Sequence, residues 1–304
     1  RRRTSNEGYK AGNVREFCHS HGSDFDFMLP LDADSLMSGE TILRMTRIAQ
    51  AHPKIGILQS LVVGAPSRSA FARIFQFGMR HGMRPYTMGS AWWTADCGPF
   101  WGHNALVRIA PFVEHCHLPV LPGGPPLGGQ IMSHDQVEAT FMRRGGYEVR
   151  VLPEEVGSYE ENPPTLLEFT RRDLRWCQGN MQYFRLLATP GLQPMSRFQL
   201  VWAISMFIGI PAWTAIILLS ALKPLDGEDG EAEASRKFLR DWAPGYPREG
   251  TLYCHINWHI AQTELMLGNQ DAAFALFDDA ITPGTSQSPP INILTDAVAF
   301  LWRA

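Results

Sequence analysis

The sequence predicts an α/β protein with a largely parallel sheet, followed by one transmembrane helix and an all-α tail. Three observations support this fold class. Short β-like runs alternate with helix-like stretches through residues 1–198, an uncharged run of membrane-spanning length comes next, and residues 234–304 contain only helix-like segments. Alternation of strands and helices is typical of a parallel sheet covered by helices.

Composition excludes several classes of protein. Of the 304 residues, 45% are hydrophobic, which is enough to bury the core of one large domain or two ordinary ones. The formal net charge of -3 argues against a nucleic-acid partner, because binding to a phosphate backbone needs an excess of Lys and Arg. The five scattered cysteines form no C-x-x-C pair, which argues against a disulfide framework and a thiolate zinc site. No apolar signal-peptide core follows Arg1, so we expect no export signal.

Residues 1–198 contain the strand and helix patterns of the α/β part. Three apolar runs predict strands and two amphipathic stretches predict helices, namely residues 25–29, 55–59 and 148–152 for the strands and 38–51 and 135–144 for the helices. We therefore expect residues 1–198 to form one α/β domain.

Residues 199–223 are predicted to form a single transmembrane helix. No charged residue occurs from Leu200 to Leu222, between Arg197 and Lys223. A helical run of this length matches a hydrocarbon core of about 30 Å; a buried core helix is the alternative. Arginines are frequent before the run, which places the α/β domain on the cytoplasmic side of the membrane.

The tail, residues 234–304, follows an acidic linker at 224–233 and is predicted to be all helix. Amphipathic segments predict helices over 255–267, 270–280 and 294–302, a spacing typical of helical hairpins. Too few repeats are present for a solenoid, which needs about three stacked units.

Two histidines four residues apart, His255 and His259, lie on one face of the first predicted tail helix. This is the spacing of helical zinc ligands, but Ile256 replaces the Glu of the H-E-x-x-H motif. We therefore favour aromatic packing with Trp258 over a metal site. Residues 255–259, 268–273 and 296–303 resemble the tetratricopeptide-repeat 38 family, which leaves the partner of the tail unidentified.

The strongest local motif is Asp32-Ala33-Asp34, which follows an apolar run. Two carboxylates spaced by one residue at a strand end converge on one point, and Mg²⁺ or Mn²⁺ prefers such hard oxygen ligands when it also holds a diphosphate. The motif therefore predicts a metal and nucleotide-sugar site. The alternative is a strand-end turn in which Asp34 or Ser35 caps the next helix.

A second motif, Ser133-His134-Asp135, opens the predicted helix 135–144 after a loop rich in Gly and Pro. Sugar transfer needs a base that deprotonates an acceptor hydroxyl, and the Asp135 carboxylate beside a flexible loop suits that task. The alternative is that Ser133 or Asp135 is only a helix N-cap, with Glu138 completing a capping box.

A third motif, residues 169–179, combines several arginines with Trp176. Guanidinium groups would hold a diphosphate, and the indole would stack on a ring. The alternative is a basic helix that contacts lipid headgroups.

Together these motifs resemble the processive family 2 glycosyltransferases, the group that includes cellulose and hyaluronan synthases. The resemblance covers about residues 1–229 and rests on tracts in the family's order and spacing: Lys10-Ala11-Gly12-Asn13, Leu31-Asp32-Ala33-Asp34, Phe100-Trp101-Gly102-His103-Asn104-Ala105, Ser133-His134-Asp135 and Arg172-Asp173-Leu174-Arg175-Trp176. Residues 157–164 and 171–180 are most similar to the bacterial branch that makes osmoregulated periplasmic glucans. The resemblance implies a partial GT-A-type (nucleotide-diphospho-sugar transferase) domain.

The resemblance also implies an activity and a set of site residues. The activity is inverting transfer of glucose from UDP-glucose to a growing β-glucan acceptor at the cytoplasmic face of a bacterial inner membrane. Asp32 and Asp34 would hold the Mg²⁺ or Mn²⁺ ion, and Asp135 would be the catalytic base. The substrate-binding residues would be Lys10, Asn13, Asp32, His103, Asn104, Arg172, Arg175 and Trp176. Arg172 stands where the family has Gln, so its role stays open.

Two departures from the family affect this expectation. The family's first nucleotide-binding strand precedes the motif at Lys10, and we expect it to be missing along with several membrane spans. The chain is then a transferase fragment fused near Asp229 to an unrelated tail, with its own activity in question. The alternatives are a helical scaffold that carries an inert transferase relic, or a peripheral membrane protein held by an apolar anchor.

Overall fold

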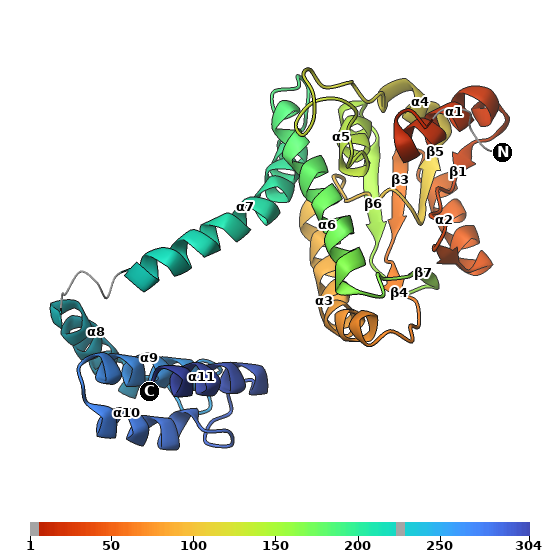
Figure 1. Ribbon diagram of the computed structural model, residues 1–304. Coiled ribbons are helices and arrows are strands. Elements are labelled where there is room, and N and C mark those ends of the chain that lie inside the picture. The colour runs from red at the N-terminus through yellow and green to blue at the C-terminus, as the bar shows by residue number, and fades with distance from the viewer. Residues whose placement is uncertain (1–5, 223–228) are drawn as a thin grey trace. The chain divides into compact units, whose positions relative to one another are not determined.

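The computed structural model describes residues 6–222 and 229–304. The chain divides into two compact units, Arg1–Ala212 and Trp213–Ala304, and each is described by itself. The division falls inside helix α7, Pro194–Leu222. The α/β elements belong to the first unit and the tail helices to the second (Figure 1).

The first unit alternates short strands with helices, as the sequence predicts. Its elements are α1 (Tyr9–His21), β1 (Phe27–Met28), β2 (Leu36–Met37), α2 (Gly39–Ala51), β3 (Ile55–Ser60), β4 (Val63–Gly64), α3 (Ala70–Thr94), β5 (Ala105–Arg108), α4 (Ile109–His115), α5 (Asp135–Arg144), β6 (Glu148–Leu152), β7 (Ser158–Glu160) and α6 (Leu166–Met181). The strands expected at 55–59 and 148–152 and the helices expected at 38–51 and 135–144 are all present within a residue. The strand expected at 25–29 shortens to β1.

The main sheet is mixed rather than largely parallel. Its strand order is β1-β5-β3-β6, and β3 pairs with β6 in parallel, whereas β5 runs antiparallel to both of its neighbours. The sequence expectation was wrong here because β5 has only four residues, too few for a periodic pattern, and yet it is inserted at the centre of the sheet. A second, three-stranded sheet has the strand order β2-β7-β4.

Both faces of the main sheet are buried, and alternate residues of each strand point to opposite faces. On β3, Ile57 belongs to one core together with Val107, Val149 and residues of α5. Its neighbour Leu58 belongs to a second core with Leu106 and residues of α2. The sheet is therefore covered by helices on both faces, which holds the loops at the strand ends in fixed positions.

Helix α7 does not form one straight membrane span. No single described helix is long and apolar enough to span a membrane; the two parts of α7, Pro194–Gly209 and Pro211–Leu219, meet the length and composition requirement only together and bend by 41° at the break. Pro211 explains the bend, since proline lacks an N–H and its ring clashes with the preceding turn. The predicted single helix 199–223 is thus corrected, and its last residue lies outside the described residues.

The first turns of α7 pack on the α/β domain. Leu200 and Ile204 are buried in the domain core, and the Gln199 side-chain amide donates to the Cys97 carbonyl at 2.6 Å. The predicted boundary at residue 198 therefore falls within a helix whose beginning is part of the first unit.

The second unit is all helix, with α8 (Asp229–Trp242), α9 (Tyr253–Met266), α10 (Gln270–Leu276), a π-helical turn (Phe277–Ile281) and α11 (Pro290–Arg303). Residues 229–233, predicted as linker, begin α8, because acidic residues such as Glu231 are favourable at a helix N-terminus. Residues 224–228 of that linker lie outside the described part of the chain. The resemblance of the tail to tetratricopeptide repeats stays a prediction.

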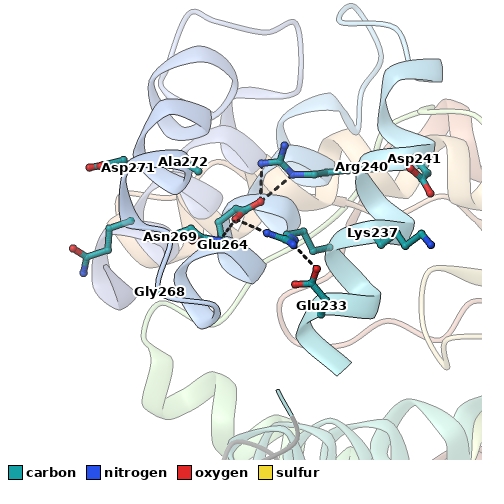
Figure 2. A pocket seen from close by; sticks show the side chains of 11 residues that line it. Glu233, Lys237, Arg240, Asp241, Glu264, Gly268, Asn269, Asp271 and Ala272 are labelled. Carbon is teal, nitrogen blue, oxygen red and sulfur yellow. Dashed lines mark hydrogen bonds and ion pairs between the residues drawn. The ribbon is translucent and has the colours of Figure 1, made fainter. Parts of the chain in front are cut away.

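A buried carboxylate, Glu264 of α9, joins α8 to the rest of the tail. Arg240 of α8 donates to it at 2.9 Å, and Asn269 donates at 2.8 Å (Figure 2). Burial raises the pKa of Glu264, but these hydrogen bonds outweigh it and hold the pKa below its ordinary value. Acidic and basic side chains alternate around the adjoining open pocket, so the pocket has no clear preference for an anion or a cation.

Candidate active site

The Asp32-Ala33-Asp34 motif lies in a tight turn between β1 and β2. The Asp32 amide donates to the Ser35 hydroxyl at 3.1 Å, and the Ser35 amide donates back to the Asp32 carbonyl at 3.1 Å. The next helix, α2, is capped by Ser38, whose hydroxyl accepts from the Thr41 amide at 3.2 Å. Neither Asp34 nor Ser35 is therefore used as a cap for α2.

Helix α1 contributes a cation to this turn. The Lys10 ammonium group forms an ion pair with the Asp32 carboxylate, and both side chains are about one-third exposed. Asn13, one turn further along α1, does not join them. It lines a groove of about 580 Å³ between α1 and the edge strand β1, together with residues such as Phe17 and Pro30. Asn13 therefore lines the groove beside β1, whereas Lys10 pairs with Asp32.

The loop before β5 joins the aspartate turn to the second sheet. One ring nitrogen of His103 lies 3.3 Å from the Ser35 hydroxyl, and the other lies 3.2 Å from the Glu160 carboxylate at the end of β7. The buried Asn104 side chain donates to the Ser158 hydroxyl at 2.8 Å and to the Tyr159 carbonyl at 3.2 Å. Because the amide of Asn104 is bonded within the protein, it positions the loop rather than facing a ligand.

Glu160 is a charged residue of the site to which the sequence motifs gave no role. Burial raises the pKa of the Glu160 carboxyl, and the negative charges of Asp34 and Asp32 add to this effect. His103 and Arg172 oppose it without reversing it. Glu160 is therefore the residue that links the aspartate turn to the arginine helix α6. It lies in the tract 157–164 that resembles the family, but no spacing rule marks it.

Asp135 is the first residue of α5, and it lies close to the loop that contains His103. A Cβ atom placed on Gly102, whose φ is +79°, would come within 3.3 Å of the Asp135 Cβ and 3.7 Å of the Lys10 ammonium nitrogen. Lys10, Asp135 and the aspartate turn thus gather around one glycine. Only glycine fits this approach without strain.

The capping-box alternative for Asp135 is wrong. The N-cap of α5 is His134, and no side chain caps the helix. Glu138, the expected partner of such a box, is buried and accepts instead from the His134 ring nitrogen at 2.9 Å. Burial alone lowers the pKa of His134, but attraction to Glu138 and their hydrogen bond outweigh burial, so the pKa lies above its ordinary value. Asp135 therefore follows a largely buried imidazole that is hydrogen-bonded to Glu138.

The Glu138 to Gln substitution is expected to destabilise the protein more at pH 6 than at pH 9. With Glu138 present, the raised pKa of His134 contributes stability that is complete below the ordinary value near 6.5 and is lost as the pH rises through the folded-state value. The thermal midpoint at the two pH values measures this. An equal loss at both would contradict the ion pair, and His134→Gln, which removes the other partner, is also expected to lose more stability at pH 6 than at pH 9.

Helix α6 carries the arginine motif. The Arg172 guanidinium lies 4.5 Å from the Trp176 ring centroid, and its Nε atom is buried without a hydrogen-bond partner among the described residues. Burial lowers the pKa of Arg172, although Glu160 opposes the effect. Arg175 and Trp176 are exposed, so they are free to contact a ligand. The structure therefore places Arg172 inward, towards Glu160, and its two neighbours outward.

Helix α6 also packs closely against the segment that precedes Asp135. A Cβ atom on Gly179 would lie 2.6 Å from the Ser133 backbone nitrogen, and the Tyr183 hydroxyl donates to the Ser133 carbonyl at 2.9 Å. The position of Asp135 thus depends on the close approach of α6.

Gly179→Ala is expected to lower the free energy of unfolding by about 1–3 kcal/mol, as overpacking does, and to reduce activity by moving Asp135. Gly78→Ala in α3 is the matched control, because a Cβ atom there meets nothing within 4 Å. That control is expected to be neutral or to gain up to about 1 kcal/mol. Denaturant midpoints and UDP release compare the two variants. If Gly179→Ala and Gly78→Ala have the same denaturant midpoint and the same rate of UDP release, the close approach of α6 does not determine the position of Asp135.

The site thus combines a turn with two aspartates, an aspartate at the start of α5 and an arginine-bearing helix around one mixed sheet. This is the arrangement of a nucleotide-sugar transferase domain. A model of the glycosyl transferase family group 2 matches residues 27–225, which is more than half of the chain. The chain therefore belongs to this family.

Several curated relatives are named glucans biosynthesis glucosyltransferase H. The protein of Xylella fastidiosa is 41% identical over 267 residues, which are 88% of this chain and 41% of the relative. Those of Cereibacter sphaeroides and Caulobacter vibrioides are 45% and 41% identical over 74% and 79% of this chain, and 38% of each relative is covered. The chain spans about two-fifths of the length of the relatives it matches. The first match is longer than the 229 residues over which the sequence motifs resemble the family.

Proposed function

We propose that the chain is the catalytic part of a membrane-bound glucosyltransferase that moves glucose from UDP-glucose to a growing β-glucan, with inversion at the anomeric carbon. The observation that carries this proposal is the gathering of Lys10, Asp32 and Asp135 around Gly102. The product would be an osmoregulated periplasmic glucan. The printed name of the relatives supports a glucan product.

Asp32 and Asp34 are proposed to hold Mg²⁺ or Mn²⁺ on the diphosphate of the donor. The donor set fits this ion, since Mg²⁺ is usually bound by one or two carboxylates together with substrate phosphates. The Asp34 side chain is exposed and does not act as a cap, and among the described residues Asp32 forms an ion pair with Lys10 and a hydrogen bond within its own turn. When bound, the ion would neutralise the charge that develops on the leaving UDP.

The chain's own residues would complete the donor site. Lys10, beside Asp32, is suited to a phosphate oxygen, because its ammonium group is a compact charge with three donors. His103 and Glu160 would hold the aspartate turn against β7. Asn13 would contribute from the groove beside β1, where the structure places it.

Asp135 is proposed to take the proton from the acceptor hydroxyl. Its position at the start of α5, next to Gly102, brings it close to Lys10, which pairs with Asp32 of the aspartate turn. Arg175 and Trp176, exposed on α6, would contact the acceptor and the diphosphate end.

The lipid bilayer is proposed as the partner of α7. Its two parts together have the length and composition of a broken span, and large apolar side chains along it such as Trp202, Met206 and Ile217 are exposed. The arginines before α7 favour a cytoplasmic position for the catalytic part at a bacterial inner membrane.

The test is UDP release from membranes that contain the chain, with UDP-glucose and Mg²⁺ or Mn²⁺ added. Release together with a β-glucan product supports the proposal. Release only with UDP-N-acetylglucosamine would exclude glucose as the donated sugar. No release from any donor would favour the alternative, in which the chain is a scaffold that carries an inert transferase domain.

A further inference from the structure

Two imidazole rings on α9 meet outside the proposed glucosyl site. His255 and His259 are one helical turn apart, and their Nε2 atoms are 3.2 Å apart. Two nitrogen ligands of a tetrahedral Zn²⁺, each at about 2.0–2.1 Å from the ion, are about 3.3 Å apart. The observed separation is therefore the one at which a single ion would be held by both rings.

A buried carboxylate holds one ring nitrogen of His255. The Nδ1 atom of His255 lies 3.1 Å from one oxygen of Asp296 on α11, and the Asp296 side chain is only 8% exposed. With Nδ1 facing Asp296, Nε2 is the ring nitrogen on the side away from that carboxylate. Carboxylate, histidine and metal form such a chain in many zinc sites.

Trp258 fixes the orientation of the two rings. It stacks on His255 with 9° between the ring planes and meets His259 edge-on at 4.8 Å between centroids. His259 is exposed, so the nitrogen pair is open to solvent.

The remaining nearby group, Cys254, is not a ligand. It is fully buried and its Sγ atom lies 3.8 Å from Asp296, whereas His259 is exposed. No group of three or more His, Cys, Asp and Glu side chains in the described part of the chain is arranged to hold a metal. Any ion on α9 has two protein ligands and keeps water at its other positions.

We propose that His255 and His259 form an open binding site for a divalent transition metal of the Zn²⁺ or Ni²⁺ type, with Asp296 as the residue that positions His255. Imidazole prefers such ions over Mg²⁺. The site is separate from the carboxylate pair Asp32 and Asp34, which prefers hard ions. Through Asp296, a bound ion would also stiffen the contact between α9 and α11.

The test is to measure Ni²⁺ binding to the full chain in detergent by titration calorimetry. Excess Mg²⁺ is present so that sites made of oxygen ligands are already occupied. His259→Ala is expected to remove one bound equivalent, or to weaken it by more than the roughly tenfold to hundredfold loss typical of a residue that only positions a ligand. His52→Ala, which removes a single exposed imidazole far from α9 in sequence, is the matched control and should keep that equivalent.

Two further measurements decide between a metal site and a simple hydrogen bond between the rings. Asp296→Asn is expected to weaken Ni²⁺ binding by about tenfold to hundredfold, and Ni²⁺ is expected to raise the thermal midpoint of the parent but not of His259→Gln. If His259→Ala binds Ni²⁺ as the His52→Ala control does, the site does not exist. UDP release is not expected to change in any of these tail variants, so this outcome is independent of the proposed glucosyl transfer.

Discussion

Asp135→Asn is expected to lower the rate of glucosyl transfer by about 10²–10⁴-fold, the usual contribution of a positioned general base. Asparagine has the same shape but cannot accept the proton of the acceptor hydroxyl. Donor binding should change little, because the diphosphate is proposed to bind at Asp32 and Asp34. UDP release under saturating UDP-glucose measures the rate, and its dependence on UDP-glucose concentration measures donor binding.

The control for this variant is Asp24→Asn, an identical chemical change at an exposed carboxylate before β1. It should leave UDP release unchanged. If Asp135→Asn releases UDP as fast as Asp24→Asn does, Asp135 is not the base. If it also loses donor binding, the carboxylate has a structural effect on the turn around Gly102, and the assignment fails for a different reason.

The local elements of the α/β domain could be predicted because their patterns are periodic. The helix at 135–144 and the strand at 148–152 have the expected bounds, since each has enough residues to show an apolar face. Strand β5 could not be predicted from its four residues. Its central place in the sheet is set by pairing with β1 and β3, which is a long-range effect.

The site was predicted in part for a similar reason. Motif spacing identified Asp32, Asp34 and Asp135, but no spacing indicates that His103 lies between Ser35 and Glu160. The pairing of Glu138 with His134 could not be predicted from the sequence either, because the spacing of these residues from Asp135 fits a capping box equally well. Side chains that act through partners distant in sequence become visible only when the fold brings them together.

For helix α7, amino-acid composition alone could predict neither the packing of its first turns nor its bend. An uncharged run of this length predicts a membrane span, but it gives no indication that Leu200 and Ile204 pack into the α/β core. Nor does it give the bend at Pro211. Proline is tolerated in membrane helices, so its presence alone leaves a straight and a broken helix equally open.

The second large effect is expected from Asp34→Asn. Removing one of two carboxylate ligands should lower UDP release by about 10²–10³-fold at fixed Mg²⁺, since stabilisation of the leaving diphosphate by a metal is worth several kcal/mol and about 1.4 kcal/mol corresponds to tenfold. The side chain is exposed and caps no helix, so the fold should persist. The thermal midpoint without metal checks that the protein remains folded.

Dependence on the ion separates this effect from a loss of local charge balance. Asp34 lies in the field of both Glu160 and Arg172, so removing its charge also changes their surroundings. If Asp34 is a metal ligand, raising Mn²⁺ should restore part of the rate in Asp34→Asn, whereas the Asp24→Asn control should saturate with Mn²⁺ as the parent does. A reduced rate with an unchanged Mn²⁺ requirement would assign Asp34 to electrostatic support of Arg172, because a lost ligand must weaken the ion it held.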